Sequence, residues 1–188
     1  YVSNCLFKSI MSSSSGGALS CSSSVTCLLV ESTSFFSCKT SGGSGAIYFS
    51  NTGSGQCVLH EICVYDCCTT NTNSYQFAYI RVYNSISNKN YINYSSISRC
   101  VNENAWYTFR IRLGKICFPS VNLSMNKCYG RFYCQSVSDS NYATCSFTYS
   151  SITDNIATQH TCFFLYTGGA KYEIKSCNIL RNTQGSLD

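Results

Sequence analysis

An aromatic or aliphatic residue recurs roughly every 28 residues along the chain, and a cysteine or asparagine usually stands three places after it. The recurring residues, which we call the predicted anchors, are Phe7, Phe35, Tyr65, Ile97, Met125, Ile152 and Ile179. The residues three places later are Ile10, Cys38, Cys68, Cys100, Cys128, Asn155 and Asn182. A period of this length is typical of a solenoid, in which each repeat forms one coil and equivalent residues stack into columns.

Each repeat contains short apolar segments of strand length. One segment lies about a dozen residues after the predicted anchor, as in residues 46–49 and 77–82. No run of apolar residues shows the spacing i, i+3, i+4, i+7 of an amphipathic helix. The pattern therefore predicts an all-β fold for residues 1–188, as one domain cut from a longer solenoid protein. The expected architecture is a right-handed single-stranded parallel β-helix of about seven coils.

The chain contains 15 cysteines, and most of them fall into the columns of the repeat. A thiol is small enough to pack inside the tight corners of a coil. Stacked coils lie about 4.8 Å apart, which also suits disulfides along a column, such as Cys38 with Cys68 or Cys27 with Cys57. The spacing leaves both states open. Paired CxxC motifs, which zinc sites use, do not occur, so we expect no metal and no cofactor.

Short motifs in the chain resemble those of the polymorphic outer-membrane protein repeats. Residues 16–19 (GGAL) and 44–49 (SGAIYF) are similar to the GGA[I/L] motif of that family, and residues 152–155 (ITDN) and 179–182 (ILRN) to its FxxN motif. Residues 35–38 (FFSC) and 65–68 (YDCC) look like versions with cysteine in place of asparagine, as in Cys-rich surface-protein variants. The resemblance implies a β-helix at the cell surface or outside the cell, acting in adhesion or in display to a host.

Many right-handed β-helices of the pectin-lyase-like fold are polysaccharide lyases or glycoside hydrolases, which need grouped carboxylates. This chain has only 8 Asp and Glu. Glu31 and Glu61 both stand four places before a predicted anchor, so we expect them to be stacked neighbours on a solvated face. His60 falls in an apolar column and is expected to be partly buried, and His160 is expected in a loop. We therefore predict no catalytic residues, with a lyase or hydrolase as the alternative.

Strand alternation places aromatic and basic residues on one outer face of the coils. The expected strip consists of Tyr48, Tyr79, Arg81, Arg110 and Arg112, with Trp106 and Thr108 on the same side. Guanidinium and aromatic groups on a rigid sheet suit an acidic glycan or an acidic patch of a host-surface protein. The hypothesis is a non-enzymatic binding surface. A plain structural spacer without a ligand is the other non-enzymatic possibility.

Charge and hydropathy exclude two classes of partner. The net charge is +5, and the 13 Lys and Arg are scattered, whereas nucleic-acid sites concentrate basic residues. No apolar stretch approaches the length of about 18 residues that a membrane-spanning helix needs. Sequons at Asn93 and Asn122 permit glycosylation if the protein is secreted by a eukaryotic cell.

Overall fold

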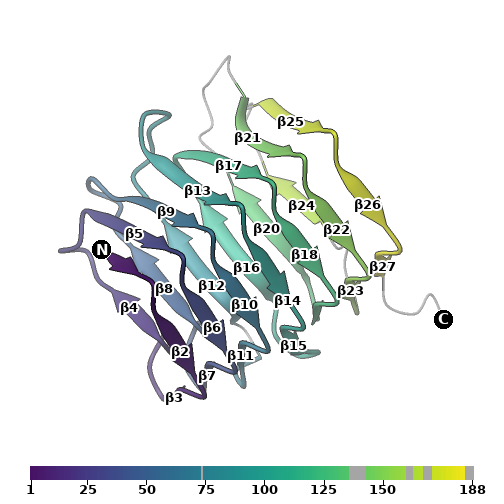
Figure 1. The fold of residues 1–188 in the computed structure, drawn as a ribbon, viewed down its shortest axis with the longest axis horizontal. Coiled ribbons are helices and arrows are strands. Elements are labelled where there is room, and N and C mark those ends of the chain that lie inside the picture. The colour runs from purple at the N-terminus through teal and green to yellow at the C-terminus, as the bar shows by residue number, and fades with distance from the viewer. Residues whose placement is uncertain (73, 136–142, 160–162, 167–170, 185–188) are drawn as a thin grey trace.

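The computed structural model describes residues 1–72, 74–135, 143–159, 163–166 and 171–184, which form strands and turns. The strands pair in parallel with their counterparts in the neighbouring coils. Figure 1 shows a long stack in which strands nearest the viewer run toward the lower right and those behind run back. Because successive coils advance from left to right, the winding is right-handed. The predicted parallel β-helix is confirmed.

Two sheets, A and B, contain seven strands each and run along the whole stack. Sheet A consists of β1 (Val2–Ser3), β5 (Cys27–Glu31), β9 (Gln56–His60), β13 (Lys89–Asn93), β17 (Lys115–Pro119), β21 (Ala143–Thr148) and β25 (Lys171–Lys175). Sheet B consists of β2 (Leu6–Lys8), β6 (Ser34–Phe36), β10 (Cys63–Tyr65), β14 (Ser96–Ser98), β18 (Asn122–Ser124), β22 (Ser151–Thr153) and β26 (Asn178–Leu180).

Among the described residues, the other three sheets contain fewer strands. Sheet D consists of β4 (Leu19–Cys21), β8 (Ile47–Ser50), β12 (Tyr75–Arg81), β16 (Tyr107–Arg112), β20 (Arg131–Gln135) and β24 (Phe163–Tyr166). Sheet C consists of β3 (Met11–Ser12), β7 (Lys39–Thr40) and β11 (Cys68–Thr69). Sheet E consists of β15 (Val101–Asn102), β19 (Lys127–Cys128), β23 (Ile156–Ala157) and β27 (Thr183–Gln184).

The inward column of sheet B differs from the predicted anchors in two coils. Strand pairing aligns Phe7, Phe35, Val64, Ile97, Leu123, Ile152 and Ile179. Val64 and Leu123 are fully buried, whereas Tyr65 is 37% and Met125 45% exposed. The predictions for Tyr65 and Met125 are therefore wrong. Tyr65 stands one residue after Val64 and therefore on the other face of the strand, because a strand alternates its side chains. Met125 stands two residues after Leu123, beyond the end of β18, at a corner with a φ of 55°.

The column three residues after these anchors changes in the same two coils. Its members are Ile10, Cys38, Cys67, Cys100, Asn126, Asn155 and Asn182. Cys68 pairs instead with Lys39 in sheet C, and Cys128 pairs with Ala157 in sheet E. Cys128 is still buried, but in a different column. The predictions for Cys68 and Cys128 are wrong because they were counted three places from Tyr65 and Met125, whereas Val64 and Leu123 occupy the column in these two coils.

The three asparagines of this column form a hydrogen-bonded ladder inside the stack. The Asn155 side-chain oxygen accepts the Asn126 backbone N–H at 3.1 Å, and the Asn182 side-chain oxygen accepts the Asn155 N–H at 3.1 Å. The Asn155 amide donates to the Leu123 carbonyl at 2.8 Å. Each side chain thus satisfies backbone groups at a corner where strand pairing is interrupted. The cysteines of the column make only the contact to the preceding coil, since the Cys67 Sγ lies 3.5 Å from the Phe35 carbonyl oxygen as the Asn155 amide lies near the Leu123 carbonyl oxygen.

Each sheet B strand is bounded by two residues in the left-handed backbone region. The first of them lies three residues before the inward residue of the strand, and its φ is between 44° and 55° in Asn4, Ser32, Glu61, Tyr94, Ser120, Tyr149 and Ser176. The second lies two residues after the inward residue, and its φ is between 50° and 57° in Ser9, Ser37, Asp66, Arg99, Met125, Asp154 and Arg181. The chain therefore turns sharply at fixed points of every coil. Residues other than glycine are strained in this conformation by about 1 kcal/mol or more.

We expect Met125→Gly to stabilise the protein. Met125 has a φ of 55° and an exposed side chain, so glycine removes backbone strain without removing core packing. The unfolding midpoint should rise by about 2–4 °C, corresponding to roughly 1 kcal/mol for a chain of this size. Met125→Val should lower it, because a β-branched side chain fits this region worst. Circular dichroism during heating measures both, and a lower midpoint for Met125→Gly would contradict the strain argument.

Glycines allow the coils to approach closely where sheet D begins. A Cβ on Gly17 would overlap the Gly45 carbonyl oxygen, and a Cβ on Gly45 would overlap that of Gln76. Gly130 stands in the same relation to the Trp106 carbonyl oxygen. The glycine directly before the alanine of each GGA-like motif, Gly17 or Gly45, is therefore required by the contact between neighbouring coils.

Candidate functional site

Sheet D brings the predicted binding residues together. Strand pairing places Tyr79 beside Tyr48 on one neighbouring strand and beside Arg110 on the other, and Arg81 beside Arg112. The side chains are partly exposed except that of Tyr79, which is 9% exposed. The five residues thus lie on three neighbouring strands of one sheet. Their role in binding stays a prediction.

A stack of tyrosine rings runs along this face and includes two rings that the sequence reasoning did not select, Tyr75 and Tyr107. The Tyr79 ring centroid lies 5.4 Å from that of Tyr48 and 4.9 Å from that of Tyr75. The Tyr75 and Tyr107 centroids are 5.7 Å apart. The rings thus hold one another in place along the stacking direction of the coils.

Arg110 is fixed against this stack. Its Nη1 donates to the Tyr75 hydroxyl at 3.3 Å, and its guanidinium carbon lies 5.5 Å from the Tyr107 ring centroid. Burial raises the pKa of Tyr75, and the nearby Arg110 charge opposes that rise. The Tyr75 hydroxyl therefore remains a neutral hydrogen-bonding group beside a fixed cation.

An irregularity in the strand register shapes this part of the face. The pairing of β12 with β16 shifts between Tyr75 and Ala78, as at a β-bulge. Strict alternation predicted Thr108 on the outer side, but Thr108 is fully buried and donates to Gln76 at 3.3 Å. That prediction is wrong because the pairing of β16 with β20 also shifts, between Tyr107 and Arg110, and such an irregularity breaks the two-residue period of β16. The same irregularity leaves Tyr107 partly exposed beside Arg110.

Trp106 lies between two surface hollows. Its ring centroid is 6.2 Å from that of Tyr107 and 5.2 Å from that of Tyr129, with interplanar angles of 39° and 59°. One hollow, of about 250 Å³, is lined by Tyr75, Trp106, Tyr107 and Arg110. The other, of about 230 Å³, is lined by Thr72, Asn104, Trp106 and Tyr129. Because these residues come from three coils, no single repeat in the sequence reveals the site.

The electrostatics of this face favour an anion. Strands β8, β12 and β16 contain three arginines and no Asp or Glu. The carboxylate of Glu103, which lies in the turn before Trp106, is already paired with Lys127. The face can therefore offer aromatic contact area together with a cation held in a fixed position.

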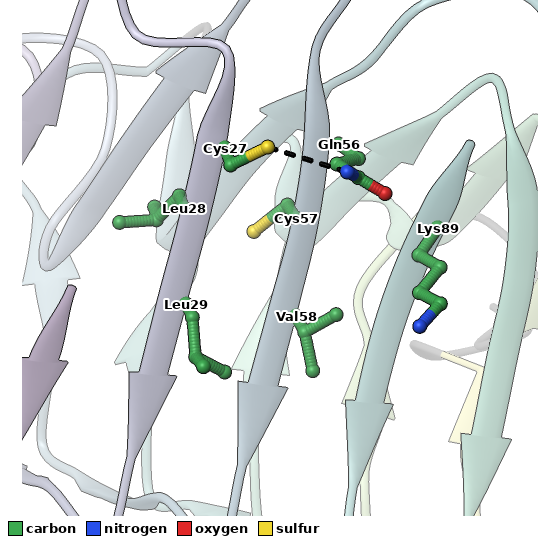
Figure 2. A pocket seen from close by; sticks show the side chains of 7 residues that line it. All are labelled: Cys27, Leu28, Leu29, Gln56, Cys57, Val58 and Lys89. Atoms are coloured by element: carbon green, nitrogen blue, oxygen red, sulfur yellow. Dashed lines mark hydrogen bonds between the residues drawn. The ribbon is translucent and has the colours of Figure 1, made fainter.

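A separate apolar hollow of about 160 Å³ lies on sheet A, and Figure 2 shows the side chains that line it. Leu29 and Val58 pair across β5 and β9, and Cys27 pairs with Gln56, whose amide nitrogen lies 3.2 Å from the thiol. Cys57 points to the interior and is 1% exposed, whereas Cys27 is exposed. The Cys27–Cys57 disulfide considered from the sequence is therefore wrong, since the two residues are one position out of register.

The acidic residues are arranged differently from the prediction. Glu31 pairs with His60 across the sheet, whereas Glu61 occupies a left-handed corner next to Ser32. The expected stacking of Glu31 on Glu61 is wrong because Val64, and not Tyr65, pairs with Phe35. Glu31 therefore lies four residues before the inward residue of its coil, whereas Glu61 lies three residues before that of the next coil. The His60 side chain is 33% exposed, with its ring 5.6 Å from the Tyr94 ring and its Nε2 3.5 Å from the Glu61 carboxylate. It is partly buried, as expected, but on the outer side of the strand.

The thiols are free in every cysteine that the structure describes. Burial raises the pKa of Cys57 and of Cys100, so these thiols stay protonated. Within the described ranges, no group of three or more His, Cys, Asp or Glu residues is arranged to hold a metal ion. His160 lies outside the described residues.

Fold and site together define a parallel β-solenoid with an aromatic face that carries arginine. Comparison of the chain with protein-family models, with curated proteins and with solved structures finds no match. The resemblance to the polymorphic outer-membrane protein repeats therefore stays a prediction. In the described part of the chain, no helix has the length and apolar character needed to cross a membrane.

Proposed function

We propose that this chain is a rigid, non-enzymatic part of a cell-surface or secreted protein and that it binds an acidic glycan through sheet D. The observation that carries the proposal is the position of Trp106 between two hollows, one of which contains Arg110. This arrangement combines a partly exposed aromatic ring with a positioned cation.

The chemistry of the face matches an acidic sugar in two respects. The apolar side of a sugar ring can pack against the faces of Trp106 and Tyr129, whose planes are inclined by 59°. A sugar carboxylate can accept hydrogen bonds from the Arg110 guanidinium. Both groups stand on or beside paired strands, so little conformational entropy is lost on binding. Adhesion and display to a host are roles that such a surface would serve.

Isothermal titration calorimetry with a tetragalacturonate and with its neutral galactose counterpart tests the proposal. We expect Trp106→Ala to weaken binding of the acidic oligosaccharide about tenfold or more, because it removes the central ring. Arg110→Gln should produce a similar loss for the acidic oligosaccharide and little change for the neutral one. Arg99→Gln is the matched control, since the Arg99 guanidinium carbon lies 5.9 Å from the Tyr65 ring centroid in sheet B, away from this face.

Three outcomes would contradict the proposal. Equal affinity of the wild type and Arg110→Gln for the acidic oligosaccharide would exclude the arginine as its partner. Absence of binding to either oligosaccharide would favour a spacer without a ligand. Release of shorter products during incubation would favour the lyase or hydrolase alternative.

A further inference from the structure

Cys38 and Cys67 occupy the same interior column in consecutive coils. Backbone hydrogen bonds on either side keep the two coils in register, because the Ser37 N–H donates to the Tyr65 carbonyl at 2.9 Å and the Cys68 N–H donates to the Cys38 carbonyl at 3.1 Å. Neighbouring coils are spaced by about 4.8 Å, and disulfides join Cα atoms about 4.4–6.8 Å apart. The backbone therefore already has a spacing that a disulfide accepts.

The two thiols are also near enough to act on each other, and both residues are fully buried. The Cys67 sulfur lies 3.5 Å from the Phe35 carbonyl oxygen of the second coil, and the Cys38 sulfur lies 3.5 Å from the Phe7 carbonyl oxygen of the first coil. The neighbouring Cys67 thiol lowers the pKa of Cys38, whereas the Cys38 thiol and burial raise the pKa of Cys67. Of the two, Cys38 therefore has the thiol that loses its proton more readily.

We propose that Cys38 and Cys67 are oxidised to a disulfide that joins the second and third coils. During folding, before the coils enclose the thiols, the Cys38 thiolate attacks one sulfur of a small-molecule disulfide such as oxidised glutathione and displaces the first thiolate. Cys67 loses its proton and attacks the Cys38 sulfur of the mixed disulfide, which displaces the second thiolate. The protein gives up two protons and two electrons, and the oxidant becomes two thiols.

The other neighbouring cysteines are less suited to this bond. Cys100 follows Cys67 in the column, but its thiol hydrogen-bonds to the Cys67 backbone rather than to the Cys67 sulfur. The Cys67 sulfur itself points toward the second coil, 3.5 Å from the Phe35 carbonyl oxygen. Cys68 lies outside the column, in a strand of sheet C. The structure thus replaces the Cys38–Cys68 pairing considered from the sequence with Cys38–Cys67.

Oxidative refolding in a glutathione redox buffer, followed by alkylation and non-reducing peptide mapping, tests the pairing. Cleavage after Glu31 and Lys39 isolates Cys38, and cleavage after Asp66 separates residues 67–68 from the earlier cysteines. We expect the Cys38–Cys67 linkage in the wild type and in the matched control Cys68→Ser, and its loss in Cys67→Ser. The oxidised wild type and Cys68→Ser should unfold on the order of 10 °C higher than after reduction by dithiothreitol.

The peptide map can also contradict the Cys38–Cys67 disulfide. Alkylated Cys38 in the refolded wild type, a Cys38–Cys68 linkage or a Cys67–Cys100 linkage would each refute it. The reduced wild type provides the reference for stability even if Cys67→Ser does not fold. The peptide map shows whether Cys38 is joined to residues 67–68, and the comparison of Cys68→Ser with Cys67→Ser shows which of the two cysteines it is joined to. The test is therefore independent of glycan binding.

Discussion

Replacing Gly45 by alanine is expected to lower the midpoint of thermal unfolding by about 10 °C, because the added Cβ has no room between neighbouring coils. The new Cβ would overlap the Gln76 carbonyl oxygen and would lie 2.7 Å from the Cys68 carbonyl oxygen. Both are backbone atoms of the next coil, which cannot rotate away as a side chain can. The coils would have to separate where the Gly45 N–H donates to the Gln76 carbonyl at 2.9 Å.

The matched control for Gly45→Ala is Gly53→Ala. Gly53 is exposed, and a Cβ there would meet only the Asn51 side-chain oxygen, at 3.6 Å. Its unfolding midpoint should stay within about 2 °C of the wild type. Circular dichroism and the fluorescence of Trp106 report the transition. Equal midpoints for the two variants would show that close approach of the coils is not what requires glycine at position 45.

Asn155→Asp is expected to destabilise the protein by about 3 kcal/mol or more at pH 7, although the two side chains have nearly the same shape. Asn155 is 1% exposed. Its amide donates to the Leu123 carbonyl at 2.8 Å and to the Asn182 side-chain oxygen at 2.9 Å. A carboxylate oxygen in place of this amide would face two acceptors inside the stack and could not be solvated.

The loss of stability in Asn155→Asp should depend on pH. The folded state disfavours the charged form, so the pKa of the introduced carboxyl is higher in the folded variant than in the unfolded chain. The deficit relative to the wild type is then smallest below about pH 4, where the carboxyl is largely neutral in both states, and grows as the pH rises. Asn122→Asp, at an exposed position of sheet B, is the control and should change little. Unfolding midpoints at pH 4 and pH 7 measure the difference, and a deficit independent of pH would contradict the ladder argument.

The candidate site was predictable only in part. The alternation of residues in β8, β12 and β16 is sufficient to place Tyr48, Tyr79 and Arg110 on one face, and the register confirms it. The hollows beside Trp106 were not predictable, because the β-bulge in β12 and the lengths of the connecting turns position Tyr107 and Tyr129 next to that ring. Neither feature leaves a periodic signal.

One local signal could have corrected the register of the third coil. The three-residue spacing between an apolar residue and a cysteine is met twice in this coil, by Tyr65 with Cys68 and by Val64 with Cys67. Only the second choice places Asp66 at the left-handed position, with a φ of 52°. Aspartate accepts that conformation more readily than most residues other than glycine. No comparable preference distinguishes Leu123 from Met125 in the fifth coil.

The sequence by itself determined that this protein is a parallel β-helix, because a period near 28 residues requires stacked coils and places equivalent residues in columns. The tertiary structure alone decided which residue of each coil enters the column. Hydrogen bonds between coils of unequal length place Val64 in the inward column instead of Tyr65, and Asn126 in the next column instead of Cys128. That register also decides on which face of the sheet Glu31 and His60 lie, and it stacks Cys67 on Cys38. The reason is that a shift of one residue exchanges the inside and the outside of a strand.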